Sequence, residues 1–363
     1  MLPIAMSGIR PLQRDDVPAA AALFERTVGT GSSPSGLESL FHRLLFEDPW
    51  QDPELPSLAY EDEGGALAGF LSRTTRRMRW RGEPFRMSVS LHFAVSPEAR
   101  GQATGALLAA RMLGGAQDGS TTEHAIEQSR RLWEGLKGRR LALQSLEWTR
   151  VLRPASYWQG RVARGGGAAA VARPLAKPLD ALAQRLPGGA AAPARLPDGV
   201  TDEPLTPEVM VAQLGALAGW ADLRPDYDVP YLRWLIAMLA DTPSFGGLAG
   251  RLVRRDGEPI GWHLSLVEPG GHAELLQLVA PPDETPVVFD ALLAHAHARG
   301  AVAARGRLEP PLLDAISRDR SVLRRGGTVM LRTRAPEPFH AVLEGRALLT
   351  RLDANGWVDV RGR

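Results

Sequence analysis

The sequence contains no cysteine, only two lysines, only four tyrosines and no long uninterrupted apolar run. The absence of cysteine excludes disulfides, thiolate nucleophiles and cysteine-bound metal ions. No apolar stretch reaches the roughly 18 residues that a membrane-spanning helix needs. The first residues, MLPIAMSGIRPLQRDD, lack the basic start and the apolar core of a secretory signal. We therefore expect a cytoplasmic protein without a membrane span.

What is present is typical of an ordinary globular protein. Of the 363 residues, 44% are hydrophobic and 23% are charged, and this chain length predicts two domains. The 43 basic residues, nearly all arginine, are balanced by 41 acidic ones, which argues against an obligate nucleic-acid partner. The locally basic stretch at 73–86 reads as a hairpin whose arginines lie mostly on a solvated face.

Hydrophobic periodicity and turn signals predict alternating strands and helices in residues 1–160. The expected order is a strand, two helices, three strands joined by turns at EGGA and RGEP, a helix at about 102–114, a short strand, a helix over IEQSRRLWEGLKG, and further strands. Residues 161–200 are rich in Gly, Ala and Pro and read as a linker. A second domain at 201–335 and a C-terminal strand or extension at 336–363 complete an α/β (mixed α+β) chain.

The two sides of this linker resemble each other. LAYEDEGGALAGFLS (58–72) aligns with GRLVRRDGEPIGWHLS (250–265), with a one-residue difference at the turn, and each contains a strand with an internal glycine. LHFAVSPEARG (91–101) aligns without a gap with LQLVAPPDETP (276–286). The shared order of hairpins, strand, Pro-acid turn and Ala/Leu-rich helix favours an internal duplication.

The turn at 97–105 carries the clearest chemistry. A strand that ends in a turn and opens a helix presents backbone amides at the positive end of the helix dipole, so such a turn attracts anions. Gly101 and Gly105 remove side chains from the approach, and Arg100 adds a positive charge. These features suit a pyrophosphate, although similar turns also occur as plain helix starts.

Placed after two hairpins and a central strand, SPEARGQATGALL resembles the acetyl-CoA loop of the GNAT superfamily of N-acyltransferases. That motif is Gln or Arg, two residues, Gly, one residue, then Gly or Ala. Arg100 fills its first position and Gly105 its last, whereas Ala103 replaces the usual middle glycine. A methyl group there crowds the phosphate if the backbone takes a positive φ. The resemblance covers about 7–155 and, through the repeat, about 205–335.

The resemblance implies two GNAT-like domains, each a mixed, mostly antiparallel central sheet with helices on both faces. It implies that acetyl-CoA, or a related acyl-CoA, binds as co-substrate, and that the acyl group passes directly to a primary amine without a metal ion. The coenzyme contacts that it implies, at the strand end and in the turn, are Phe93, Ala94, Val95, Arg100, Gly101, Gln102, Ala103, Thr104 and Gly105.

Acyl transfer to an amine also needs a route for the amine's proton. The candidate residues are His92, Glu123 and His124. On a regular strand His92 shares a face with Ser88, Ser90 and Ala94, a small polar face that suits the border of a cleft, and its imidazole can accept a proton at neutral pH. A buried core histidine is the plainer interpretation. Glu123 and His124 lie on or beside a short strand, where an ordinary loop role is the alternative.

Two features depart from the family's pattern. The segment EQSRRLWEGLKG resembles a helix that often carries a tyrosine as general acid, but its aromatic residue is Trp133, whose indole cannot serve as an acid. In the second copy Pro286 stands in place of Gly101 and removes an amide donor. Asp283 and Glu284 would repel a pyrophosphate. We therefore expect the second domain to be degenerate.

The sequence favours an N-acyltransferase whose first domain uses acyl-CoA and whose acceptor amine is undetermined. The main alternative is a non-catalytic acyl-CoA-binding or scaffold protein that retains the fold. A third interpretation, transfer of aminoacyl groups from tRNA, requires a basic groove between the halves. Both a monomer and a homodimer are compatible with the sequence.

Overall fold

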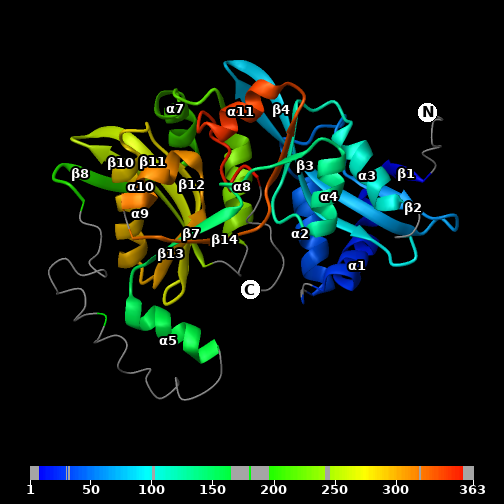
Figure 1. Cartoon of the computed structure of the whole chain (residues 1–363), viewed down its shortest axis with the longest axis horizontal. Helices are drawn as coiled ribbons and strands as arrows, with labels where there is room; N and C mark the ends of the chain where they lie inside the picture. The colour runs from blue at the N-terminus through cyan, green and yellow to red at the C-terminus, as the bar shows by residue number, and fades with distance from the viewer. Residues whose placement is uncertain are drawn as a thin grey trace.

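The computed structural model describes residues 8–29, 31, 33–99, 103–164, 180, 196–241, 246–318 and 320–354 (Figure 1). The described chain forms two mixed β-sheets with helices packed on them, an α+β architecture. Within this part of the chain, no helix is both long and apolar enough to cross a membrane.

The first sheet is built around two long antiparallel strands, β3 and β4. Its order is β1-β2-β3-β4-β5-β15-β6, and β9 pairs with the far end of β3. The strands are β1 (Ile9–Pro11), β2 (Leu58–Glu61), β3 (Leu67–Trp80), β4 (Glu83–Val95), β5 (Gly119–Thr122), β15 (Met330–Thr333), β6 (Arg139–Arg140) and β9 (Leu223–Pro225). Helices α1 (Val17–Val28) and α2 (Pro34–Phe46) pack on one face, and α3 (Thr104–Leu113) with α4 (Glu127–Gly135) on the other.

The second sheet repeats this plan with the order β14-β7-β13-β12-β11-β10-β8. Its strands are β14 (Val322–Arg325), β7 (Leu146–Val151), β13 (Ala303–Arg307), β12 (His272–Val279), β11 (Glu258–Val267), β10 (Gly247–Arg255) and β8 (Val200–Pro204). The helices of this half are α5 (Pro154–Arg164), α7 (Pro207–Leu217), α8 (Val229–Ala240), α9 (Thr285–Ala298) and α10 (Leu313–Arg318). Helix α11 (Pro336–Leu343) packs on β15 and β9 of the first sheet.

The two halves exchange strands: the first half contributes β7 to the second sheet, and the second half contributes β9 and β15 to the first sheet. β7 precedes the linker in sequence, yet it lies between β13 and β14 of the second sheet. β15 comes from the second half and lies between β5 and β6 of the first sheet. The expected boundaries at 160 and 201 therefore do not separate the two sheets. In the expected C-terminal strand or extension, the described residues 336–354 begin with the helix α11 rather than a strand.

Local sequence explains where several helices begin. Ser33 caps α2 by accepting a hydrogen bond from the Gly36 amide at 3.1 Å. Thr206 and Asp228 cap α7 and α8 in the same way. Asp16 precedes α1, but its carboxylate accepts from the Gln13 amide and from Arg10 instead of from the helix.

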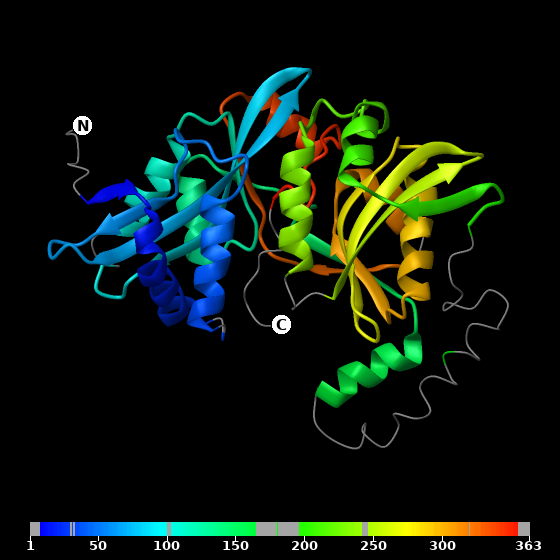
Figure 2. The same cartoon turned by 180° about the vertical axis from the view of Figure 1, so that it is seen from behind.

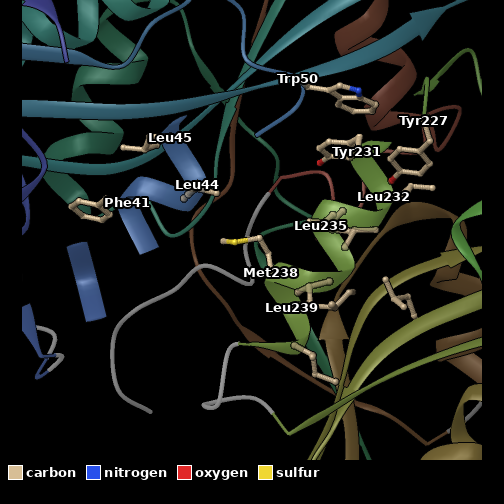
Figure 3. Close-up of a cluster of buried hydrophobic side chains, with 14 of the residues drawn as sticks. Phe41, Leu44, Leu45, Trp50, Tyr227, Tyr231, Leu232, Leu235, Met238 and Leu239 are labelled. Carbon is tan, nitrogen blue, oxygen red and sulfur yellow. The ribbon is translucent and has the colours of Figure 1, made fainter. Parts of the chain in front are cut away.

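A continuous apolar core joins the halves. In Figure 3, Phe41 and Leu44 of α2 lie on one side of this core, and Leu235 and Met238 of α8 lie on the other. Trp50 follows α2 and stacks on Tyr231 of α8, with ring centroids 3.5 Å apart and planes 5° from parallel. This shared core makes the two halves one structural unit.

The predicted linker at 161–200 falls almost entirely outside the described residues. Its ends are described: α5 runs to Arg164, and β8 begins at Val200. Asp180 is also described; its carboxylate accepts hydrogen bonds from the amides of Ala155 and Ser156 at the start of α5.

Candidate functional site

A β-bulge in β4 determines which way His92 points. In the pairing of β3 with β4, Leu71 lies opposite Phe93 and Arg73 opposite Ser90, so Ser72 alone faces both Leu91 and His92. One extra residue in a strand moves every following side chain to the other face of the sheet. The expected face shared with Ser88 and Ser90 is therefore wrong. Ser88 points to Met112 of α3, whereas His92 points to α1 and α2.

The His92 ring is buried, and among the described residues Phe24, Phe41 and Ser72 hold it. It packs edge-on against Phe24 of α1, with centroids 5.1 Å apart, and at a tilt against Phe41 of α2, at 4.7 Å. Its Nδ1 is 3.1 Å from the hydroxyl of Ser72, and the same hydroxyl accepts the backbone N–H of His92 at 2.9 Å. These contacts fix the orientation of a titratable ring directly at the bulge.

The strands diverge just beyond the bulge. The parallel pairing of β4 with β5 joins Met87–Ser90 to Gly119–Thr122 and stops there, although β4 runs on to Val95. Phe93 and Val95 are half-buried on the α3 side, and Ala94 is buried on the α1 side. A β-carbon placed on Gly105 would lie 3.3 Å from the Phe93 ring, so the first turn of α3 lies directly over this strand end.

Three residues of the predicted phosphate turn, Arg100, Gly101 and Gln102, lie outside the described residues. Ala103 is described and has φ +59°, the left-handed conformation that favours glycine. Thr104 is fully buried, and its hydroxyl has no hydrogen-bond partner in the described part of the chain. The first helical hydrogen bond runs from Leu107 to the Ala103 carbonyl, so the preceding amides of α3 point out of the helix end. This end suits an anion.

An acidic cavity of about 660 Å³ lies on the other side of this turn. Its lining includes Ser96, Glu98 and Ala99 of the turn and the acidic corner between β2 and β3 at 61–64. The carboxylate of Glu61 is paired with Arg10 at 2.7 Å. The acidic lining of this cavity is therefore unfavourable for an anionic group.

Glu123 lies directly after β5 but faces the second half of the chain. Its buried carboxylate forms an ion pair with Arg307 of β13, and Arg351 is 3.9 Å away. Burial raises the pKa of the neighbouring Glu309 to about 7, against the lowering effect of Arg307. His124 has φ +56° and, with Glu123, lines a small cavity between the halves. These contacts favour a structural role for Glu123 at the junction.

Trp133 lies in the apolar core beneath α3. It is buried in an apolar cluster with Leu108 and Met112 of α3 and with Met330 of the exchanged strand β15. Of the four tyrosines, Tyr227 and Tyr231 are buried at the junction, and Tyr60 lines the acidic cavity. Tyr157 lies on α5, where its ring contacts His272. The structure places none of these rings on α4.

The corresponding gap of the second half is filled by the chain itself. The pairing of β12 with β13 ends at Glu274, although β12 continues to Val279. Beyond that point the Leu352 amide donates to the Leu276 carbonyl at 3.0 Å, and the Arg307 guanidinium donates to the Leu349 carbonyl. The C-terminal segment 349–352 thus bridges the two diverging strands.

The amino end of α9 also differs from that of α3. Glu284 is its N-cap residue and pairs with Arg255, and the Thr285 hydroxyl and amide both donate to the Pro281 carbonyl. The hydrogen-bond donors of the turn that precedes α9 are therefore bonded within the turn itself, and the turn carries acidic side chains.

The basic hairpin at 73–86 is neutralised by the second half. Figure 2 shows the β3–β4 hairpin leaning over the second half, where β9 pairs with β3. Three of its arginines form ion pairs with carboxylates of the segment before α8: Arg77 with Asp228, Arg79 with Asp226 and Arg81 with Asp222. This pairing leaves little basic surface here for a tRNA or another nucleic acid.

No sequence motif marks Ser72, Arg307 or Arg351 as functional residues. Ser72 became recognisable only through the bulge, because a serine in a strand carries no motif. Arg307 and Arg351 lie far from Glu123 in sequence and reach it only through the packing of the two halves.

Comparison with known proteins shows the fold. No protein-family model and no curated protein sequence matches the chain. A GCN5-related N-acetyltransferase from Anabaena variabilis superposes with a TM-score of 0.59 and 13% identity, over 90% of this chain and 72% of that one. A GCN5-related N-acetyltransferase from Kribbella flavida gives 0.54 and 14%, over 90% and 70%.

A third similar structure is a N-myristoyltransferase. The Saccharomyces cerevisiae enzyme, with bound myristoyl-CoA and inhibitors, gives a TM-score of 0.50 and 13% identity, over 92% of this chain and 82% of that one. The chain therefore has the tandem GNAT fold that its sequence resemblance implies, with both halves included in the match.

Proposed function

We propose that the first half of this tandem GNAT fold binds acetyl-CoA, or a related acyl-CoA, and transfers the acyl group directly to a primary amine. The observation that carries the proposal is the divergence of β4 and β5 beside the outward-pointing amides of α3. A thioester held in such a gap needs only positioning and stabilisation of the charge that develops on its carbonyl oxygen.

In this proposal the coenzyme's pantetheine arm runs along Phe93, Ala94 and Val95, and its pyrophosphate lies at the turn 100–105. Two features are consistent with a group bound there: the bare α-carbon of Gly105, close to Phe93, and the hydroxyl of the buried Thr104, which has no hydrogen-bond partner among the described residues. Bound acyl-CoA supplies the activated acyl group, and the chain's residues hold and orient it.

We assign the reacting centre to His92 and not to Glu123. His92 lies on the bulge next to the point where the strands diverge. Removing Glu123 would take away one of the two carboxylates that pair with the buried Arg307, the other being Glu309. The alternative of a non-catalytic acyl-CoA-binding protein is favoured by one observation: the buried Trp133 supplies no acid from α4.

For the second half we propose support of the first half, not a second transfer site. The segment 349–352 occupies the gap between β12 and β13, and the turn before α9 is acidic and internally bonded. The strand β15, which pairs with β5 beside the proposed site, is the direct contribution of this half.

Binding of the coenzyme is tested by calorimetry with acetyl-CoA. Arg100→Glu should weaken binding at least about tenfold, because it reverses a charge at the phosphates. Arg140→Glu, at an exposed position of the short strand β6, is the matched control and should bind like the wild type. Absence of binding at millimolar acetyl-CoA contradicts the proposal. Equal affinity of the Arg100→Glu chain contradicts the assignment of the turn.

Catalysis is tested by release of coenzyme A. Because the chain has no cysteine, any free thiol that forms comes from the coenzyme. Incubation with acetyl-CoA and, separately, a free amino acid, a polyamine and a peptide with a free α-amine should release thiol with at least one acceptor above the rate without protein. Binding without release by any acceptor supports the non-catalytic alternative.

A further inference from the structure

We propose that Ser72 is a positioning residue that fixes His92 in the neutral tautomer with its proton on Nε2, so that His92 acts as a hydrogen-bond donor in the transfer and not as the acceptor of the amine's proton. The catalytic part of this inference rests on the proposed function of the same site. The tautomer itself is a property of the protein without any ligand.

The hydrogen bonds of Ser72 determine the tautomer. The Ser72 side chain is fully buried, and its hydroxyl has two partners in the described structure, both in His92. The backbone N–H of His92 can only donate, so the hydroxyl oxygen accepts that bond. The hydroxyl proton then has Nδ1 as its acceptor, and a buried hydroxyl proton left without an acceptor would cost free energy. Nδ1 is therefore unprotonated, and the neutral ring carries its proton on Nε2.

The bulge and two aromatic rings keep His92 in this arrangement. The same Ser72 oxygen anchors the backbone of the bulge and the imidazole, so the ring cannot turn about its side-chain bonds without breaking the contact to Nδ1. Phe24 and Phe41 pack against the ring from α1 and α2. A ring that is fixed in this way has one defined direction for its Nε2–H.

The second half contains the same arrangement with another side chain. The alignment of LHFAVSPEARG with LQLVAPPDETP places Gln277 at the position of His92, and β12 carries a corresponding bulge against β11. The Gln277 oxygen accepts from Trp262 of the neighbouring strand at 3.1 Å. Its nitrogen donates away from that strand, to Tyr227 at 2.8 Å and to Thr350 at 3.3 Å. An indole N–H can only donate, so this orientation of the amide is determined.

In both halves, therefore, the polar residue of the bulge accepts from the neighbouring strand; Gln277 donates away from that strand, and in His92 the remaining donor is Nε2–H. In the proposed reaction the Nε2–H of His92 stabilises the negative charge on the acyl oxygen while the amine's C–N bond forms and the C–S bond breaks. The amine loses one proton to water, and the coenzyme thiolate takes one from water. His92 keeps its proton throughout.

The tautomer is tested by nitrogen NMR of the full chain labelled at its histidines, without ligand. The His92 signals are identified by their loss in His92→Gln. In the wild type, Nδ1 should have the chemical shift of an unprotonated nitrogen. Ser72→Ala should change this shift, and Ser72→Thr, which keeps the hydroxyl, should restore it. Ser88→Ala, a buried serine of β4 on the opposite face, is the matched control and should leave it unchanged.

The role as donor is tested by comparing two substitutions of His92. A glutamine amide can replace the Nε2–H donor but cannot take up a proton, whereas alanine does neither. If His92 donates, turnover of His92→Gln should stay within about tenfold of the wild type, and His92→Ala should fall about 10²–10³-fold. Thermal unfolding of each variant separates these effects from loss of fold.

The outcomes separate the two proposals. Equal loss of turnover in His92→Gln and His92→Ala contradicts the donor role, and a protonated Nδ1 in the wild type or an unchanged shift in Ser72→Ala contradicts the positioning role. No acyl transfer by the wild-type chain contradicts the proposed function and the donor role that rests on it. The NMR result then still decides whether Ser72 fixes the ring.

Discussion

Ala103 places a β-carbon on a backbone conformation that favours glycine. Its φ of +59° brings Cβ close to the following carbonyl oxygen, which costs an L-residue roughly 1–2 kcal/mol. The same residue is the last before α3, so its conformation sets the direction of the amides that we assign to the pyrophosphate. The strain therefore lies at the proposed coenzyme contact.

We expect Ala103→Gly to raise the free energy of unfolding by about 1 kcal/mol and to strengthen acetyl-CoA binding. Urea unfolding and calorimetry measure the two effects. Ala106→Gly, at an exposed position within α3, is the control and should lower the free energy of unfolding by about 0.5–1 kcal/mol. Destabilisation by both substitutions would contradict the strain argument.

His263 is a second residue whose surroundings have a measurable effect, here on the pH dependence of stability. It is fully buried under α9, and both of its ring nitrogens lack hydrogen-bond partners within the described residues. Burial, and to a smaller extent the nearby His295, lowers its pKa from 6.5 to about 3. The folded state therefore keeps the ring neutral at pH values where the unfolded chain binds a proton.

Because its folded pKa is lowered, His263 contributes full stability above pH 6.5 and progressively less as the pH falls toward 3. At pH 5 the loss is about 2 kcal/mol. His263→Leu copies the first half, where Leu71 likewise lies two residues after the internal glycine of its strand. Urea unfolding at pH 7 and pH 5 should show a smaller loss on acidification in this variant. An equal loss would contradict the assignment to His263.

At the scale of elements, the β4 bulge separates what the sequence could predict from what it could not. Alternating hydrophobicity predicts the strand and the following helix, and both are present, whereas three residues of the turn between them lie outside the described residues. Strict alternation also predicts that His92 lies with Ser88 and Ser90, which is wrong. A bulge depends on how two strands pair, and nothing in one strand's sequence reveals it.

The exchange of strands between the two halves could not be predicted from the sequence for a similar reason. β7 and β15 each follow a short strand of their own half, and their side-chain patterns suit either sheet. Which sheet a strand joins is decided by the packing of the complete chain. The internal repeat is recognisable in the sequence because it preserves the local order of strands, turns and helices. The exchange changes only which strands pair with each other.

The C-terminal segment is expected to matter for stability well beyond its length. Leu352 is fully buried in the core that both halves share, and its amide bonds to β12. Leu352→Ala should lower the free energy of unfolding by about 2–5 kcal/mol through the lost burial and the cavity that remains. Leu343→Ala, at a largely exposed position at the end of α11, should change it by less than about 1 kcal/mol. Similar effects of the two substitutions would argue against insertion of the segment.

For the whole molecule, the resemblance of SPEARGQATGALL to an acetyl-CoA loop, together with the repeat, predicts the tandem fold, and this is confirmed. The turn itself could be read from local residue types. The junction between the two halves could not be predicted from the sequence. Its contacts, such as Trp50 on Tyr231 or Glu123 with Arg307, join residues that are far apart in the sequence.

The exchange predicts that the halves do not fold separately. A chain of residues 1–185 lacks β15 and β9 and exposes the core on α2, and a chain of residues 186–363 lacks β7. Each fragment alone should be insoluble or lack cooperative thermal unfolding. Expressed together, the fragments should form a soluble complex that purifies as one species. A cooperatively folded first fragment would contradict this account.

The central claim, that one half of the chain holds acyl-CoA and the other half supports it, is tested most directly by the stoichiometry of acetyl-CoA binding. Calorimetric titration of the full chain should give a single site per chain, and Arg100→Glu should weaken that site. Two sites would contradict the assignment of the segment 349–352 as a filler of the second gap. No site would contradict the proposed function.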